Sequence, residues 1–370
     1  MPVSEKAPPK PSAVAGPLEF KQSSTLEHDR ELVSARFSLC GKYLFAGSYD
    51  SNVYRWDIKT GTKTEFFFHH GWIQGLAFHP DRKRFFTGDS WGGLCAWNYA
   101  DERPKPLWKK SDAHARWMRA MAISPDGAQL ATCGADRIIK LWSTSDGAAK
   151  WESAVQDDDL HSLQFHPTGD ALLVGDLKGI ITHWDLATRA PVRRLDARIL
   201  YLRPVISGVP EINDVGGVRC IAVDHDGKNI ACCGSQPVSS GFFTGKPTIV
   251  VIDWETGKQK KTLQWENADP SEGVALDVAW HADGFLMAAS SGQPGKGAVY
   301  FWKPGEKSPF YIEKKLAHSR SVSLSADGDR LAFLQVAPSS GQGGNGRHLA
   351  EGDEYLGFNS VIRVFESSKV

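Results

Sequence analysis

The chain contains 370 residues, and its 43 basic and 43 acidic side chains give a formal net charge of zero. A protein that mainly holds nucleic acid or an anionic membrane needs net or clustered positive charge, so this balance argues against both classes of partner. No stretch approaches the roughly 18–20 consecutive apolar residues that span a membrane. The six cysteines lack C-x-x-C spacing and fall mostly in expected strands, which indicates free thiols and a cytoplasmic location.

The N-terminal segment, residues 1–17, contains no apolar run and is rich in proline, alanine, serine and lysine. It lacks the apolar stretch of a signal peptide, and we expect it to be a disordered tail. Residues 18–370 carry repeated strand-like units, and we expect them to form one domain.

A short phrase that closes on tryptophan recurs along this domain. It reads Ser-Tyr-Asp-Ser-Asn-Val-Tyr-Arg-Trp at residues 48–56 and Ala-Asp-Arg-Ile-Ile-Lys-Leu-Trp at residues 135–142. Looser copies end at Trp97, Trp184 and Trp302. Repeats at a spacing of about 40–45 residues, each with several short strands, predict a β-propeller, which is a ring of sheets called blades.

Turns give each unit a second mark. A short apolar strand ends in a turn that often contains Pro-Asp or Asp-Gly, because proline fixes φ and glycine accepts the left-handed conformation that reverses the chain. Seven such marks occur, at residues 37–41, 78–81, 123–127, 165–169, 223–227, 280–284 and 324–328. The residues at the tryptophan position of the seven units are Trp56, Trp97, Trp142, Trp184, Ile252, Trp302 and Phe365. We therefore expect an all-β, seven-bladed propeller with four-stranded antiparallel blades.

The two ends of the domain are incomplete in complementary ways. The last unit ends soon after its third strand, residues 360–365, and lacks a fourth strand. Residues 18–25 precede the first unit and have no blade of their own. Because a closed ring leaves no exposed sheet edge, we expect residues 18–25 to supply the missing outer strand and close the ring.

The polar residues around the third tryptophan resemble those of the WD-repeat (WD40) family, and the resemblance covers essentially residues 18–370. Blades of that family often contain a hydrogen-bonded tetrad: a His before the first strand, a Ser or Thr in the second, an Asp in the next turn and the Trp of the third. Blade three contains all four, as His114, Thr132, Asp136 and Trp142. The resemblance implies a structural role for them, since they satisfy one another's buried polar groups.

Other blades depart from the tetrad. Blade one has Ala46 where the hydroxyl is expected, blade two has Trp91 where the Asp is expected, and blade four keeps only Trp184. We predict no metal site, because the adjacent His69 and His70 have no third ligand at a fixed spacing and tetrad histidines are otherwise employed.

Four insertions interrupt the later repeats, at residues 198–217, 235–247, 290–297 and 337–358. The first joins blades four and five, and the others join the second and third strands of blades five, six and seven. These connections emerge on one face of a four-stranded blade, so we expect them to build a recognition rim there. The alternative is tolerated surface insertion, since longer loops cost little entropy. The candidate binding residues of the insertions are Arg198, Tyr201, Arg203, Phe242 and Phe243.

A second candidate site lies at the inner rim of the same face. Alignment of the repeats by their turn marks places residue pairs just before the first strand of blades one to four. With the neighbouring Trp91, the candidate set is Arg30, Glu31, Trp72, Trp91, Arg116, Trp117, Asp158 and Asp159. Such a mixed surface suits a peptide anchored by an apolar or basic side chain. The alternative is that Trp72 and Trp117 pack sideways onto neighbouring loops.

Motifs of serine hydrolases, zinc proteases and P-loop proteins are missing from the sequence, so we predict no catalytic residue and no cofactor. We expect a protein-interaction scaffold or adaptor that presents a rigid, loop-bearing face to protein or peptide partners. We expect it to act as a monomeric propeller within a larger complex, with no nucleic acid or membrane partner. The alternative is a propeller enzyme, similar to a lactonase or hydrolase, that binds a small ligand or metal in its central channel.

Overall fold

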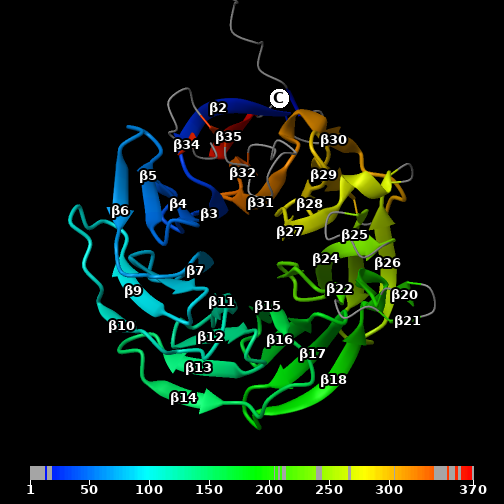
Figure 1. The fold of residues 1–370 in the computed structure, drawn as a ribbon, viewed down its shortest axis with the longest axis horizontal. Helices are drawn as coiled ribbons and strands as arrows, with labels where there is room; N and C mark the ends of the chain where they lie inside the picture. Colours follow the sequence, from blue (N-terminus) through cyan, green and yellow to red (C-terminus); the bar gives the residue numbers. More distant parts are fainter. Residues whose placement is uncertain are drawn as a thin grey trace, which may run out of the picture.

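The computed structural model describes residues 13–14, 19–203, 205–206, 209–210, 214–238, 244–265, 268–303, 305–336, 348–349, 355–356 and 360–368. Their strands form six four-stranded sheets, one five-stranded sheet and three two-stranded ribbons. Figure 1 shows the seven larger sheets as the blades of a ring. The expected all-β, seven-bladed propeller is confirmed.

Six blades are built from four strands that follow one another along the chain, and we call these strands a to d from the centre outward (Figure 1). Blade one comprises β3 (Leu32–Phe37), β4 (Tyr43–Ser48), β5 (Val53–Asp57) and β6 (Lys63–Phe66). Blade two comprises β7 (Ile73–Phe78), β8 (Arg84–Asp89), β9 (Leu94–Asn98) and β10 (Trp108–Lys110). Blade three comprises β11 (Met118–Ile123), β12 (Gln129–Gly134), β13 (Ile139–Ser143) and β14 (Ala149–Glu152). Blade four comprises β15 (Leu160–Phe165), β16 (Ala171–Asp176), β17 (Ile180–Asp185) and β18 (Ala190–Asp196). Blade five comprises β23 (Cys220–Val223), β24 (Asn229–Pro237), β25 (Gly245–Asp253) and β26 (Gln259–Gln264). Blade six comprises β27 (Val274–Trp280), β28 (Leu286–Ser291), β29 (Val299–Trp302) and β30 (Tyr311–Glu313).

Short elements lie between these strands. The helical turns of the described residues are η1 (Arg198–Leu200), η2 (Pro270–Glu272) and η3 (Lys314–Leu316). The ribbon strands are β19 (Tyr201–Leu202) with β22 (Val215–Gly216), β20 (Val205–Ile206) with β21 (Val209–Pro210), and β33 (His348–Leu349) with β34 (Tyr355–Leu356).

Blade seven joins the two ends of the chain. It contains β31 (Ser319–Leu324), β32 (Arg330–Val336), β35 (Ser360–Ser368) and β2 (Glu19–His28). β2 runs antiparallel to β35 along its whole length, and Figure 1 shows the two strands side by side. The expected closure by the N-terminal strand is confirmed. Outside β2 lies β1 (Ala13–Val14); the rest of the tail that we expect to be disordered lies outside the described residues.

The apolar core lies between blades. The tryptophan-position residue of every strand c is buried and pairs with strand b in the same register, as Trp142 does with Leu130 and Phe365 with Leu331. In the described part of the chain, seven buried apolar clusters each join two neighbouring blades. Ring closure therefore buries the apolar faces of all blades against one another.

Three histidines of the a–b turns also tie blades together. His79, His166 and His281 place Nε2 at 2.8–3.2 Å from the carbonyl oxygen of a turn glycine in the next blade. A carbonyl oxygen can only accept, so each imidazole donates its Nε2–H. These bonds lie on the a–b face of blade pairs two–three, four–five and six–seven.

The described ends of the first two insertions lie on the opposite face, which we call the b–c face because the b–c turns lie there. At the end of the first insertion, the N–H of Val218 donates to the carbonyl of Asp176 at the b–c turn of blade four (3.0 Å). In blade five, β24 and β25 stay paired as far as Pro237 and Gly245. The expectation of a loop over 235–247 is therefore wrong at both ends, because extended strands form its base.

Candidate functional site

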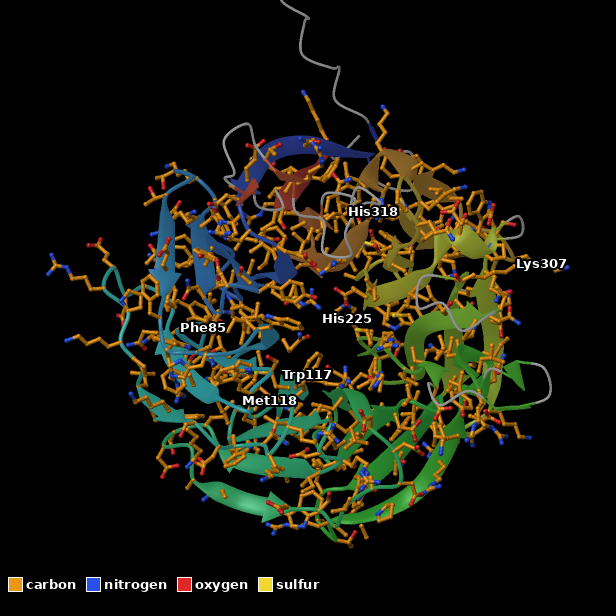
Figure 2. All side chains as sticks on the ribbon, in the orientation of Figure 1. Phe85, Trp117, Met118, His225, Lys307 and His318 are labelled. Atoms are coloured by element: carbon orange, nitrogen blue, oxygen red, sulfur yellow. The ribbon has the colours of Figure 1, made fainter. Side chains whose placement is uncertain are left out.

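The residue before strand a is hydrogen-bonded to the b–c turn of its own blade in blades one to four. The N–H groups donate to the carbonyls in the pairs Tyr49 to Glu31 (3.0 Å), Ser90 to Trp72 (2.9 Å), Ala135 to Trp117 (2.8 Å) and Leu177 to Asp159 (2.9 Å). The repeated bond fixes the four acceptor residues at equivalent positions around the centre of the b–c face. Figure 2 shows Trp117 at the inner edge of the ring, whereas Phe85 lies within the body of a blade.

Three of these positions form a continuous row of rings, which we call the aromatic arc: Tyr49, Trp72 and Trp117. The ring centroids of Tyr49 and Trp72 are 4.7 Å apart, and those of Trp72 and Trp117 are 5.4 Å apart in an edge-to-face arrangement. Trp72 and Trp117 are each 41% exposed. They therefore pack sideways on each other and still present apolar surface to solvent.

An arginine–carboxylate pair stands at each end of the aromatic arc. At the blade-one end, Arg320 lies 2.5 Å from Glu31 and its guanidinium contacts Tyr49. At the blade-three end, Arg119 lies over the ring of Trp117 and 3.7 Å from Asp159. Planar guanidinium groups stack on aromatic faces, so these pairs hold the end rings in place.

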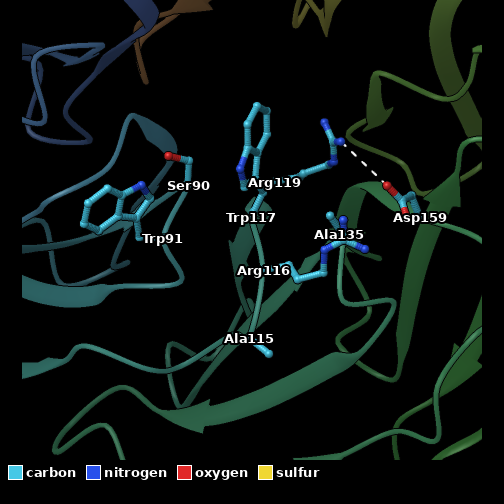
Figure 3. Close-up of a pocket in the computed structure, with 8 residues that line it drawn as sticks. All are labelled: Ser90, Trp91, Ala115, Arg116, Trp117, Arg119, Ala135 and Asp159. Carbon is cyan, nitrogen blue, oxygen red and sulfur yellow. Dashed lines mark ion pairs between the residues drawn. The ribbon is translucent and has the colours of Figure 1, made fainter.

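A hollow of about 670 Å³ lies beside the blade-three end of the arc. Its lining residues are Ser90, Trp91, Ala115, Arg116, Trp117, Arg119, Ala135 and Asp159. Figure 3 shows Trp117 and Arg119 pointing the same way, with the Arg119 guanidinium directed towards Asp159. Trp91 stands on the opposite side of the hollow and is 70% exposed. The hollow thus combines aromatic surface with guanidinium groups.

The structure separates the inner-rim candidates into two groups. It brings Trp91, Arg116, Trp117 and Asp159 together around the hollow. Glu31 and Trp72 instead belong to the remainder of the arc and its blade-one end. Arg30 is exposed, and Asp158 pairs with Lys178 at 2.8 Å, so neither lines the hollow.

The insertion candidates lie apart from the hollow. Arg198 pairs with Asp196 at 2.6 Å, and the Tyr201 hydroxyl donates to Asp214 at 2.9 Å. Arg203 is exposed. The candidates Phe242 and Phe243 lie outside the described residues. The described insertion residues therefore form local polar contacts and no shared pocket with the inner rim among the described residues.

Blade three forms the tetrad that the resemblance implies. The ring of His114 contacts Asp136 through Nδ1 (2.8 Å) and Thr132 through Nε2 (2.7 Å), and Trp142 Nε1 donates to Thr132 Oγ1 (2.9 Å). A carboxylate only accepts, so Nδ1–H donates to it and Nε2 accepts the threonine proton. This assigns His114 to the scaffold.

Blade two also has a full tetrad, which corrects our expectation of a missing Asp. Asp89, two residues before Trp91, accepts from Nδ1 of His69 at 2.8 Å. His69 Nε2 contacts Thr87 Oγ1 (2.6 Å), to which Trp97 donates. Burial alone would raise the pKa of Asp89, but the bonds from His69 and from backbone N–H groups lower it to about 2. Because Asp89 supplies the carboxylate, Trp91 is free to project into solvent.

Blades one and four lack the tetrad. In blade one, His28 Nε2 lies 3.8 Å from Asp50, whose carboxylate accepts from the Tyr54 hydroxyl at 2.8 Å. In blade four, the Nε1 of Trp184 is buried and has no hydrogen-bond partner within the described part of the chain. Burial and the charge of nearby Asp158 raise the pKa of Asp176 in the same blade.

Among the described residues, no group of three or more His, Cys, Asp or Glu side chains is placed to hold a metal ion. In that same part of the chain, no helix is long and apolar enough to cross a membrane.

Sequence reasoning missed three members of this site: Tyr49, Arg119 and Arg320. Tyr49 could have been found, because it occupies the b–c turn position of Ser90 and Ala135 when the repeats are aligned. The two arginines occupy the second position of strand a, where a strand pattern does not reveal which face the side chain takes.

Comparison with known proteins places three segments in one family. The sequence matches the WD domain, G-beta repeat family over residues 20–57, 61–98 and 106–143. Each segment begins on, or two residues before, the outer strand of one blade and ends on strand c of the next. The match thus follows the ring across blade boundaries, as the closure by β2 requires.

Three curated relatives cover different parts of the chain. Protein groucho of Drosophila melanogaster is 29% identical over 42% of this chain and 21% of its own length. A U3 snoRNP-associated protein-like protein of Arabidopsis thaliana is 25% identical over 75% of this chain and 54% of its own length. Human echinoderm microtubule-associated protein-like 2 is 36% identical over 58% of this chain and 33% of its own length. The matches span about half or less of each relative.

The matched repeats, the seven blades, the tetrads of blades two and three and the ring closure agree with one another. Residues 20–57, 61–98 and 106–143 are WD40 repeats within this seven-bladed β-propeller.

Proposed function

We propose that this propeller is a protein-interaction scaffold whose partners bind the b–c face at the aromatic arc. The observation that carries the proposal is the half-exposed pair Trp72 and Trp117 at the inner rim. Tryptophan and arginine are the residues most enriched at binding hot spots, and here they lie together on one rigid ring. Because the blades fix the rim before a partner arrives, little conformational entropy is lost on binding.

The relatives support the general role. Two are named for the assemblies that they join, a snoRNP and microtubules, and none of the three reported is named for an enzymatic activity. These names support a scaffold with protein partners. The cytoplasmic location and the lack of a catalytic residue and of a cofactor stay predictions from the sequence.

Affinity capture tests the proposal. Tagged wild-type protein, the double variant Trp72→Ala with Trp117→Ala, and Phe67→Ala are each incubated with native cell extract, and bound proteins are identified by mass spectrometry. Phe67 is a matched control, because it is an aromatic residue that is 62% exposed and has no ring contact with the arc. We expect one set of proteins on wild type and Phe67→Ala, and its loss from the double variant.

Thermal unfolding of each variant verifies that the ring is intact. A folded double variant that captures the same proteins as wild type contradicts the proposed site. Loss of capture by Phe67→Ala as well would indicate a wider surface than the arc.

A further inference from the structure

Strand a contains a one-residue β-bulge in six of the described blades, at its second residue in five of them and at its third in blade six. In blade three, Met118 pairs with Gly134 and Ala120 pairs with Cys133, which leaves Arg119 without a partner on strand b. The bulged residues of the six blades are Val33, Gln74, Arg119, His161, Leu276 and Arg320. A bulge re-aims a side chain, and strand a is the innermost strand, so these residues form a ring around the centre of the b–c face (Figure 1).

Blade five contributes Arg219 to the same ring. Its N–H donates to the carbonyl of Cys233 at 2.8 Å, next to the paired residues Cys220 and Cys233. That is the place of Arg119 beside Ala120 in blade three. Blades three, four and five therefore bring Arg119, His161 and Arg219 to adjacent positions on the ring.

Three basic side chains, Arg119, His161 and Arg219, lie close enough in this quarter of the face to influence one another's pKa. Burial, then the charges of Arg219 and Arg119, hold the pKa of His161 well below its ordinary value. Burial, followed by the charge of Arg119, lowers the pKa of Arg219 to about 10. His161 is 8% exposed, and its Nδ1 has no hydrogen-bond partner among the described residues.

The arginines at the two ends of the aromatic arc differ in how closely a carboxylate neutralises their charge. Arg320 forms a close pair with Glu31 at 2.5 Å, whereas Arg119 lies 3.7 Å from Asp159 and its buried Nε has no hydrogen-bond partner in the described part of the chain. Arg116, on the same hollow, is exposed and takes part in no ion pair within the described ranges. A single carboxylate therefore faces two guanidinium groups in the hollow, with Arg219 nearby.

We propose that the hollow beside Trp117 selects an acidic segment of the partner protein, and this rests on the proposed function. A carboxylate or phosphate group of the partner binds Arg116 and Arg119, and an apolar neighbour in the partner packs between Trp117 and Trp91. Guanidinium groups bind both anions through paired N–H donors. The sequence alone suggested an apolar or basic anchor; a basic anchor would face two arginines with only Asp159 to oppose them.

The probe is a set of four degenerate octapeptide pools that differ in one fixed central residue: Glu, phosphoserine, Gln or Lys. Each pool is passed over immobilised full-length protein, and the retained peptides are quantified and sequenced. We expect the Glu or phosphoserine pool to be retained about 5- to 10-fold more than the Gln and Lys pools, with apolar residues enriched near the fixed position. Comparison of the two acidic pools distinguishes a carboxylate from a phosphate ligand.

Variants locate the effect. Arg116→Gln should abolish the preference for the acidic pool, and Arg116→Glu should shift it to the Lys pool. Both leave the fold intact because Arg116 is exposed. Arg30→Gln is the matched control. Arg30 occupies the equivalent position before strand a of blade one, outside the hollow, and its substitution removes the same charge from the same face. It should keep the preference.

The two proposals fail differently. Equal retention of all pools, or the highest retention of the Lys pool by wild type, overturns the acidic selection while the aromatic arc can still bind partners. A preference that survives Arg116→Gln also overturns it. Retention of no pool by wild type, together with unchanged capture by the Trp72 and Trp117 double variant, removes the proposed function itself.

Discussion

Blades two and three and blades five to seven solve the same structural problem with different chemistry. Blades two and three each bury a His, an Asp and a Thr that satisfy one another beside the strand-c tryptophan. On the other side of the ring, the buried carboxylate of Asp277 in blade six takes that role near the centre. It pairs with Arg36 of blade one (2.8 Å) and accepts from the N–H of Val322 in blade seven (2.9 Å).

Comparison of these two groups of blades shows which polar residues are available for function. Tetrad residues repeat, so they can be recognised in the sequence and set aside as scaffold. Asp277 does not repeat, yet it is 4% exposed and fully engaged, so it too belongs to the scaffold. The aromatic arc and the arginines beside it are what the scaffold leaves exposed on the b–c face.

The largest effect is expected at Asp277. Asp277→Ala removes the partner of Arg36 and leaves the N–H of Val322 buried, so we expect a loss of about 3–5 kcal/mol in the free energy of unfolding. Urea denaturation measures it. Asp157→Ala is the control, because Asp157 and its partner Arg194 are both mostly exposed and such pairs contribute about 0–1 kcal/mol. An equal effect at both positions would contradict the central role of Asp277.

The tetrad of blade three gives the next effect. Thr132→Val leaves the ring of His114 and the Nε1 of Trp142 without their common partner, and we expect a loss of about 2–3 kcal/mol. Blade four already has Val174 at this position. A loss below about 0.5 kcal/mol in the free energy of unfolding would mean that the tetrad adds little to stability, and that it does not make blade three more stable than blade four.

The pH dependence of stability tests the role of the tetrad carboxylate Asp89 in blade two. The folded-state pKa of Asp89 is about 2 against an ordinary 3.8, so its contribution, about 2 kcal/mol, is present above pH 4 and is lost as the pH falls towards 2. The stability difference between wild type and Asp89→Asn should therefore narrow over that range. A difference that stays constant would show that the Asp89 carboxylate is not selectively stabilised by folding.

The smallest expected effect is a difference in stability between Trp142→Phe and Trp184→Phe. Trp142→Phe loses the bond to Thr132, whereas Trp184→Phe loses no hydrogen bond that the described residues make. Both lose similar apolar area, so Trp142→Phe should be more destabilising by about 1 kcal/mol in matched urea titrations. The reverse order would contradict the assignment of the two blades.

Most of the fold could be predicted because its signals repeat. The turn marks recur once per blade and the tryptophan phrase in five of the seven blades, so the number of blades follows from the sequence. Ile252 and Phe365 could be placed because the register with strand b is the same in every blade. The strand extension to Pro237 could not, since its residues are not typical strand formers.

The site was predicted only in part. Glu31, Trp72, Trp117 and Asp159 follow from the alignment of repeats, but Arg119 depends on a bulge, and a one-residue bulge leaves no mark in sequence. Asp89 was missed because it lies two residues before the family position. Its carboxylate instead accepts the N–H groups of the turn that Trp91 and two glycines build.

The central claim is that partners bind at the aromatic arc, and site-specific cross-linking tests it most directly. A photo-reactive amino acid is placed at Ala115, an exposed residue that lines the hollow beside the arc, or, as the control, at Val192, which is 58% exposed on the outer strand β18. Each protein is irradiated in native extract with the captured partner. We predict a cross-link to the partner from position 115 and none from position 192. A cross-link from position 192 alone would contradict the account.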